Sequence, residues 1–239
     1  MASVKKRIKY ILSYSWQMIK SALPSFFMYI CAGLIILMIA FRGEKITWSG
    51  SVITWTAVCI IGAAAYNALL AWSYGGSHYE MLVSGNMKRA SMDMYGNEIK
   101  ISTHKEAQEY RVWKGFVVGT INGLAPVITG IAFGLSFATG PDVTLNAGGL
   151  VGFLLSGWSI LPFYCMNAAG MHVSYFLSCL FALIPIAVNG GFYIAGAYAR
   201  RNKAIRQQML ADKAAEAEAN RVKKINYGGL PGSKPRKKR

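Results

Sequence analysis

Long stretches of this sequence contain no charged residue. No Asp, Glu, Lys or Arg occurs from Gly115 to Pro141 or from Val143 to Ala199. Only 15% of all residues are charged, whereas a soluble domain carries about 25%. Charge-free runs of about 18 residues or more are typical of transmembrane helices. The missing charge therefore argues against a soluble domain and predicts an all-α, polytopic membrane protein.

Charges are also missing from the centres of the apolar segments, which restricts the kind of membrane protein. Proton-coupled transporters, pumps and voltage sensors usually carry ionisable groups at membrane depth, so a proton relay is disfavoured. The polar groups expected at depth are amides, hydroxyls and one imidazole, with candidates Asn67, Asn122, Asn167, His172 and Asn189. Two roles remain open for them, namely contact with a solute and hydrogen bonding between helices.

Cysteine is scarce, and catalytic motifs are absent from the sequence. The four cysteines lie inside apolar segments and form no CxxC pair. This pattern argues against a disulfide framework and against a zinc site of known spacing. The sequence also has no Walker loop, no GxSxG, no HExxH and no strand-linked GxGxxG. We therefore expect no catalytic residue, no metal, no cofactor and no enzymatic activity.

Five apolar segments are present, and both ends of the chain are basic. By composition the chain divides into a basic amphipathic interfacial helix at 1–23, spans one and two at 24–72, a cytoplasmic insert at 73–114, three apolar segments at 115–198, a cytoplasmic helix at 199–226 and a disordered basic tail at 227–239. Pro24 favours a new helix start at the first span. The alternative is that the N-terminal helix simply extends that span.

The distribution of basic residues conflicts with five spans. Five crossings would place the two ends on opposite faces, whereas Lys and Arg favour the cytoplasmic face. Of the 26 basic residues, five precede the first span, two follow it, six lie in or at the border of the insert, none lies between spans three and four, and thirteen follow Ala199. Only the C-terminal group conflicts with a five-span chain that starts inside. We expect both termini to be cytoplasmic.

The conflict disappears if the segment at 148–165 enters the membrane and returns. This segment contains four glycines and Pro162, and non-helical backbone at membrane depth is tolerated where protein or a water-filled cavity surrounds it. We predict four spans plus this one re-entrant segment. The alternative is a five-span protein that violates the charge rule. Six spans would place four of them, with their turns, in about 85 residues, which leaves almost no residues for the turns at about 20 residues per span.

The insert has signs of local structure. Residues 99–102 alternate in polarity like a short strand. Thr103 and Glu106 have the spacing of a capping box. This motif predicts a helix that runs from His104 through Glu109 and Trp113 into the third span.

Glycines recur every four residues in the third span. They are Gly115, Gly119 and Gly123, followed by Gly130 and Gly134. Such a face permits close packing of helices, and its partner is open between a helix of this chain, another membrane subunit and a solute path. The candidates for solute contact or helix packing are Asn67, Gly119, Asn122, Gly123, His172 and Asn189.

The basic C-terminal region suggests a second kind of site. Each Lys or Arg near an anionic leaflet contributes about 1 kcal/mol, and a flexible basic end also suits RNA phosphates, such as those of a ribosome. The candidates for anionic lipid headgroups or RNA are Arg200, Arg201, Lys203, Lys234, Arg236, Lys237, Lys238 and Arg239.

Two functions are compatible with these features. The first is a transport- or pore-type protein of the plasma membrane that handles a solute through neutral polar groups. The second is a non-catalytic scaffold or accessory subunit whose insert and tail dock a partner, anionic lipid or the ribosome. A cavity lined by Asn67, Asn122 and Asn189 would favour the first, and a solid bundle with every amide paired would favour the second.

Overall fold

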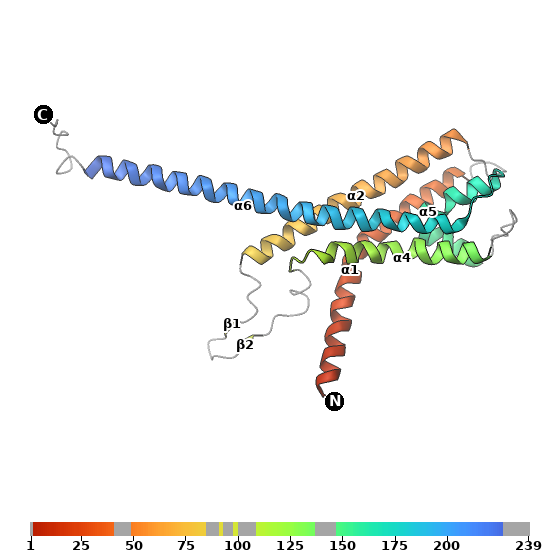
Figure 1. The fold of residues 1–239 in the computed structure, drawn as a ribbon, viewed down its shortest axis with the longest axis horizontal. Coiled ribbons are helices and arrows are strands. Elements are labelled where there is room, and N and C mark those ends of the chain that lie inside the picture. Colours follow the sequence, from red (N-terminus) through yellow and green to blue (C-terminus); the bar gives the residue numbers. More distant parts are fainter. Residues whose placement is uncertain are drawn as a thin grey trace. The chain divides into compact units, whose positions relative to one another are not determined.

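A computed structural model of the chain describes residues 2–40, 49–84, 91–92, 98–99, 109–136 and 147–226. Its elements are α1 (Ala2–Ala40), α2 (Gly50–Val83), β1 (Ser91–Met92), β2 (Glu98–Ile99), α4 (Trp113–Ser136), α5 (Ala147–Ala168), η1 (Tyr175–Ala182) and α6 (Leu183–Asn226) (Figure 1). The two short strands pair antiparallel. Apart from β1 and β2, all regular secondary structure in the described chain is helical, which confirms the prediction of an all-α protein there.

Five helical segments are long and apolar enough to cross a membrane, which is compatible with a multi-pass membrane protein. They are Ile8–Ala40, Gly50–Val83, Trp113–Ser136, Gly149–Ala168 and Tyr175–Asn220. The chain divides into two compact units, Met1–Ala197 and Tyr198–Arg239. The first unit holds the helix bundle, and the second consists of the later part of α6 and the residues that follow it.

The N-terminal basic segment and the first span form one helix. α1 has 39 residues and contains Pro24 in its interior, so the new helix start expected at Pro24 is absent. Proline removes one helical hydrogen bond and commonly bends a helix, and Figure 1 shows α1 changing direction along its length. The placement of residues 1–23 in a membrane interface stays a prediction.

α2 extends past the predicted end of the second span, from Trp72 to Val83. The continuation packs against α6 at a position where only glycine fits. A β-carbon at Gly75 would lie 1.9 Å from the backbone oxygen of Tyr193. Close packing against α6 therefore stabilises helix at 73–83, a segment whose polar composition predicts part of the insert.

α4 begins at Trp113, and Glu109–Val112 is not helical. The prediction of a continuous helix through Glu109 into the third span is therefore wrong at these residues, while 103–106 lie outside the described residues. The Lys114 amide donates to the carbonyl of Arg111 at 3.0 Å, which closes a turn before the helix. β2 matches the beginning of the predicted strand at 99–102, whose remainder also lies outside the described residues.

The glycine face of α4 packs against η1 and the first part of α6. A β-carbon at Gly119 would lie 2.5 Å from the carbonyl oxygen of Pro185, and one at Gly130 would lie 2.5 Å from the hydroxyl of Ser178. Gly115, Gly123 and Gly134 make contacts of the same kind with Tyr193, Ala182 and Phe176. The two segments run antiparallel, and Figure 1 shows α4 alongside the start of α6. This face is therefore covered by helices of the same chain.

α5 is folded back on itself. Ser156 has a non-helical backbone (φ −137°, ψ 25°) that separates a first arm, 147–155, from a second arm, 157–168. The ring centroids of Phe153 and Tyr164 lie only 5.2 Å apart. Eleven residues of straight helix would separate these positions by about 16 Å, so the two arms must lie side by side.

Contacts with neighbouring helices locate both arms of α5. In the first arm, a β-carbon at Gly152 would touch the ring of Phe133 near the end of α4. At the bend, Trp158 stacks on Tyr29 of α1 with centroids 4.4 Å apart. In the second arm, Cys165 clusters with the last residue of α1 and with Val52 of α2. α5 therefore begins and ends at the same end of the bundle, and its bend lies inside.

α5 is also the most buried of the apolar segments. In its apolar window 72% of the residues are buried, against 28% to 39% in the other four segments. Trp158, Ile160 and Leu161 are at most 1% exposed. Protein surrounds α5 on most sides, whereas the other helices keep broad apolar faces exposed.

Candidate functional site: a cavity between four helices

A cavity of about 310 Å³ lies between α1, α2, α4 and α6, at the end of the bundle opposite the ends of α5. Its described lining residues are Gln17, Met18, Lys20, Ser21 and Ser25 of α1, Leu70, Ala71, Tyr74 and His78 of α2, Lys114, Gly115 and Val118 of α4, and Asn189 and Tyr193 of α6. This volume is at the lower end of the range for small-molecule sites, about 300–1,000 Å³.

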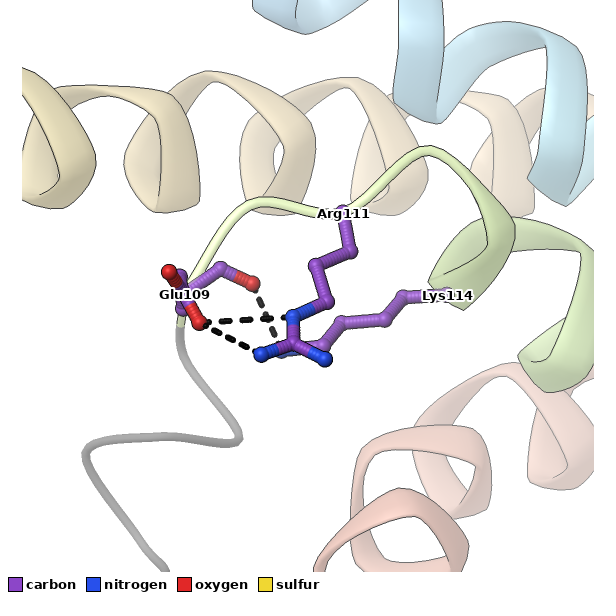
Figure 2. A network of polar contacts seen from close by, with 3 residues as sticks. All are labelled: Glu109, Arg111 and Lys114. Atoms are coloured by element: carbon purple, nitrogen blue, oxygen red, sulfur yellow. Dashed lines mark hydrogen bonds and ion pairs between the residues drawn. The ribbon is translucent and has the colours of Figure 1, made fainter.

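Lys114 is the most buried charged residue of the cavity wall, with 2% of its surface exposed. Its Nζ donates to the carbonyl oxygen of Glu109 at 2.6 Å and lies 5.6 Å from the ring centroid of Tyr14. The Glu109 carboxylate accepts instead from Arg111, at 3.1 Å. Figure 2 shows both basic side chains reaching back toward Glu109. The turn before α4 thus fixes the ammonium of Lys114 at the cavity.

Aromatic side chains form one wall around His78. The His78 Nδ1 and the Tyr193 hydroxyl are hydrogen bonded at 2.9 Å. Tyr110 stacks on Tyr193 with centroids 5.3 Å apart, and Tyr79 meets Tyr110 edge-on. These contacts join α2, α6 and the segment before α4. They hold the hydroxyl of Tyr193 and the imidazole of His78 in fixed positions.

Neutral polar groups line the inner part of the cavity. Ser25 lines it directly, and its Oγ accepts from the Asn122 Nδ2 at 2.8 Å, with both residues at most 3% exposed. Asn189 also lines it, and its Nδ2 donates to the Pro185 carbonyl at 2.9 Å. Because Ser25 accepts from Asn122 through its oxygen, its hydroxyl hydrogen is not used in that bond.

A second group of buried polar atoms lies deeper in the bundle. Asn67 is 0% exposed and faces the hydroxyl of Tyr29. Among the described residues, no hydrogen bond of good geometry reaches the Asn67 amide, the Tyr29 hydroxyl or the Ser156 hydroxyl. A buried polar group without a hydrogen-bond partner lowers the stability of the folded protein. Such groups concentrate at functional sites or beside ordered water.

The structure separates the residues that the sequence singled out. Asn189 lines the cavity and Asn122 lies directly behind it, whereas Asn67 lies deeper and is not among the lining residues. Gly119 and Gly123 are packing positions against α6 and η1. His172 is exposed in the turn between α5 and η1, where its backbone is left-handed (φ 46°).

The basic candidates all fall in the second unit or outside the described residues. Arg200, Arg201 and Lys203 are exposed on α6. The remaining candidates, Lys234 and Arg236 to Arg239, lie outside the described residues. Their proposed binding of lipid or RNA stays a prediction.

Several cavity residues were not recognised as a site from the sequence. Lys114 was assigned to the border of the insert, and His78 to its interior, because both lie in polar sequence. Ser25 and Tyr193 resemble ordinary residues of apolar helices. One available sign was the spacing of Lys114, Val118 and Asn122, which places a cation and an amide on one face of the third span.

No protein-family model, curated protein or solved structure matches this chain. The comparisons therefore supply no functional information.

Proposed function

We propose that this chain is a multi-pass, transport-type protein of the plasma membrane that binds a small solute in the cavity between α1, α2, α4 and α6. The observation that carries the proposal is the cavity itself, in which Ser25, Asn189 and Tyr193 present polar groups between helices. Pockets between bundle helices with a few convergent polar groups are typical ligand sites. The protein acts by binding and conduction, without catalysis.

We propose further that four helices cross the membrane and that α5 enters and returns on the same side. Each arm of α5 has about ten residues, or ~15 Å of helix, which is half of the ~30 Å hydrocarbon core. The contacts of Gly152 with Phe133 and of Cys165 with Ala40 support this topology, because both place the ends of α5 beside other helix ends. The high burial of α5 supplies the protein surroundings that a broken helix needs.

In this topology the cavity faces the cytoplasm, and α5 closes the opposite side. The insert and both termini, which hold most of the basic residues, are then cytoplasmic. The buried side chains of Trp158, Ile160 and Leu161 form the closure. A solute path would therefore require the bend of α5 to move, and Tyr29, Asn67 and Ser156 are polar groups available along it.

A scaffold or accessory function is the second candidate. Two observations favour it: the Nδ2 groups of Asn122 and Asn189 both donate hydrogen bonds within the bundle, and the second unit exposes a basic helix beginning with Arg200. In this reading the insert, the helix at 199–226 and the tail at 227–239 dock a partner, anionic lipid or a ribosome, and the cavity stays unused.

Access of water-soluble thiol reagents to the cavity tests the main proposal. Ser21→Cys and Val118→Cys would be made separately in a chain whose four native cysteines are replaced by Ala. Both positions line the cavity, so we expect a membrane-impermeant reagent to label them in inside-out vesicles and not in right-side-out vesicles.

Leu124→Cys is the matched control, because Leu124 lies on α4 and is 49% exposed but does not line the cavity. We expect it to resist labelling from either side, since it faces lipid in the proposed topology. Equal resistance of Ser21→Cys and Val118→Cys would contradict a water-accessible cavity and favour the scaffold.

A further inference from the structure

We infer that the cavity binds an anion whose charge is carried on oxygen, of the carboxylate or phosphate class, and that Lys114 is its counter-charge. This inference rests on the proposed solute-binding function and specifies its ligand. It also refines the expectation that only neutral polar groups contact the solute.

The charges on the cavity wall have one sign. Among the described residues that line the cavity, Lys20 and Lys114 are basic and none is acidic. The Glu109 carboxylate, whose backbone carbonyl accepts from Lys114, itself accepts two hydrogen bonds from Arg111. A cationic solute would meet two ammonium groups there, whereas an anion would be attracted to them.

The position of Lys114 suits a binding role. It is the second residue of α4 and is almost fully buried, whereas lysine is rarely buried without a specific reason. Its Nζ can donate three hydrogen bonds, and the carbonyl of Glu109 fixes its direction. Electrostatic attraction is stronger at such a poorly hydrated position than at the surface.

The neutral groups around Lys114 are donors that fit oxygen anions. The hydroxyl of Ser25 can donate because its oxygen accepts from Asn122. When the His78 Nδ1 accepts from Tyr193, the proton of the imidazole is on Nε2, which is then a further donor. Hydrogen bonds from several donors to one anion, with a cation beside them, are the usual composition of carboxylate and phosphate sites.

The cavity volume indicates a small ligand. About 310 Å³ suffices for a small organic anion but not for a whole phospholipid with its acyl chains. The anionic group could still come from two sources, a soluble molecule or the headgroup of a lipid whose chains remain outside. The test therefore includes an arm for each source.

The charge selectivity of the wild-type protein is the first measurement. The full chain would be placed in nanodiscs of zwitterionic phosphatidylcholine, and the midpoint of thermal unfolding would be followed with inorganic phosphate, succinate, glycerol or choline at constant ionic strength and chloride. Ligands that bind the folded state raise this midpoint. We expect phosphate or succinate to raise it and glycerol and choline to leave it unchanged.

Variants assign the effect to one side chain. We expect Lys114→Met to weaken the apparent affinity for the effective anion by about ten-fold to a hundred-fold, because a hydrogen bond to a charged group is lost. Lys114→Arg retains the charge and should keep the preference for anions. Lys9→Met removes an exposed charge from α1 outside the cavity lining and should have no effect. If Lys114→Met does not fold, the inference is still tested by whether the wild-type protein responds to phosphate or succinate and not to glycerol or choline.

The lipid arm repeats the measurement in discs that contain phosphatidylglycerol. A rise of the midpoint with this lipid that is lost in Lys114→Met assigns the anion to a headgroup, and a rise with phosphate or succinate in phosphatidylcholine assigns it to a soluble molecule. A rise with glycerol or choline alone would overturn the inference while leaving a solute-binding cavity. No rise in any arm, together with unreactive cysteines at positions 21 and 118, would overturn both the anion inference and the proposed solute-binding function.

Discussion

Glycine residues allow helix backbones to approach closely at three contacts of the bundle. A β-carbon at Gly75 would lie 1.9 Å from the Tyr193 oxygen, one at Gly196 would lie 2.1 Å from the Trp72 oxygen, and one at Gly33 would lie 2.8 Å from the Trp158 nitrogen. The neighbouring atoms are backbone and cannot rotate away. These glycines therefore join α2 to α6 and α1 to α5, and the contact at Gly75 is made with Tyr193, a residue of the cavity wall.

Gly75→Ala should destabilise the bundle by about 1–3 kcal/mol or more, because overpacking forces the backbone to shift. Gly62→Ala is the matched control in the same helix, since a β-carbon there meets nothing within 4 Å. The measurement is unfolding of the purified chain by a denaturing detergent in mixed micelles. Equal stability of the two variants would contradict the close approach of α2 and α6.

The hydrogen bond between Asn122 and Ser25 should be measurable as a coupling free energy. Interhelical hydrogen bonds in membrane proteins average about 0.6 kcal/mol, with values up to about 1.7 kcal/mol. A double-mutant cycle of Asn122→Ala and Ser25→Ala, followed by the same unfolding assay, should give a coupling in this range. Strict additivity of the two single variants would argue that these side chains do not interact.

The bend of α5 is the feature of the elements on which the proposed topology depends. Ser156 interrupts the helix, and the contact between Phe153 and Tyr164 requires the arms to fold together. Trp158 at the bend stacks on Tyr29, whose hydroxyl faces the fully buried amide of Asn67. The bend therefore brings an interruption of the helix to the polar centre of the bundle.

Cross-linking tests the fold-back of α5. Cysteines at positions 153 and 164, in a chain without native cysteines, should be joined efficiently by a short bifunctional thiol reagent, because the two rings they replace are in contact. Cysteines at Phe27 and Met38 of α1 have the same sequence separation on an unbroken helix. A straight helix places such a pair about 16 Å apart, so equal yields from both pairs would contradict the fold-back.

Sequence patterns predicted the helices better than the contacts between them. Charge-free length alone located the apolar segments, and the glycine spacing correctly marked a packing face. The extension of α2 to Val83 was missed, because Gly75 and His78 appear polar in sequence and become helical through packing on Tyr193. The start of α4 was missed because the turn at Glu109 depends on a hydrogen bond from the buried side chain of Lys114, which a capping motif does not encode.

The cavity was predictable only in part, for a similar reason. Its amides were candidates because amides are rare in apolar segments, and Asn189 does line it. The roles of Ser25, Lys114 and Tyr193 depend on the convergence of three helices far apart in sequence. No local pattern records such a convergence.

For the whole molecule, the distribution of charge gives one end of the bundle a different chemistry from the other. The cavity, Lys114 and the basic N-terminal part of α1 lie at one end, and the ends of α5 lie at the other. In the proposed topology the basic end is cytoplasmic, where attraction to anionic lipid orients the protein. The positive electrostatic potential of this basic end would also concentrate an anionic solute near the cavity.

Deletion of the tail tests whether its basic residues bind lipid or RNA. Removal of the residues from Lys234 to Arg239 deletes five basic residues. We expect nanodisc-embedded protein to lose co-sedimentation with anionic vesicles or with ribosomes, since each charge contributes about 1 kcal/mol at an anionic surface. Unchanged co-sedimentation with both would exclude a binding role for the tail.

The position of Ser174 relative to the membrane tests the central claim most directly. Ser174 is exposed between α5 and η1, and its side chain makes no capping hydrogen bond, so Ser174→Cys is a mild change. If α5 enters and returns, this cysteine reacts with an impermeant thiol reagent from outside intact cells, while a C-terminal tag stays protected until the membrane is opened. If α5 crosses, the cysteine is protected and the tag is exposed, which would contradict the four-span topology and the cytoplasmic cavity.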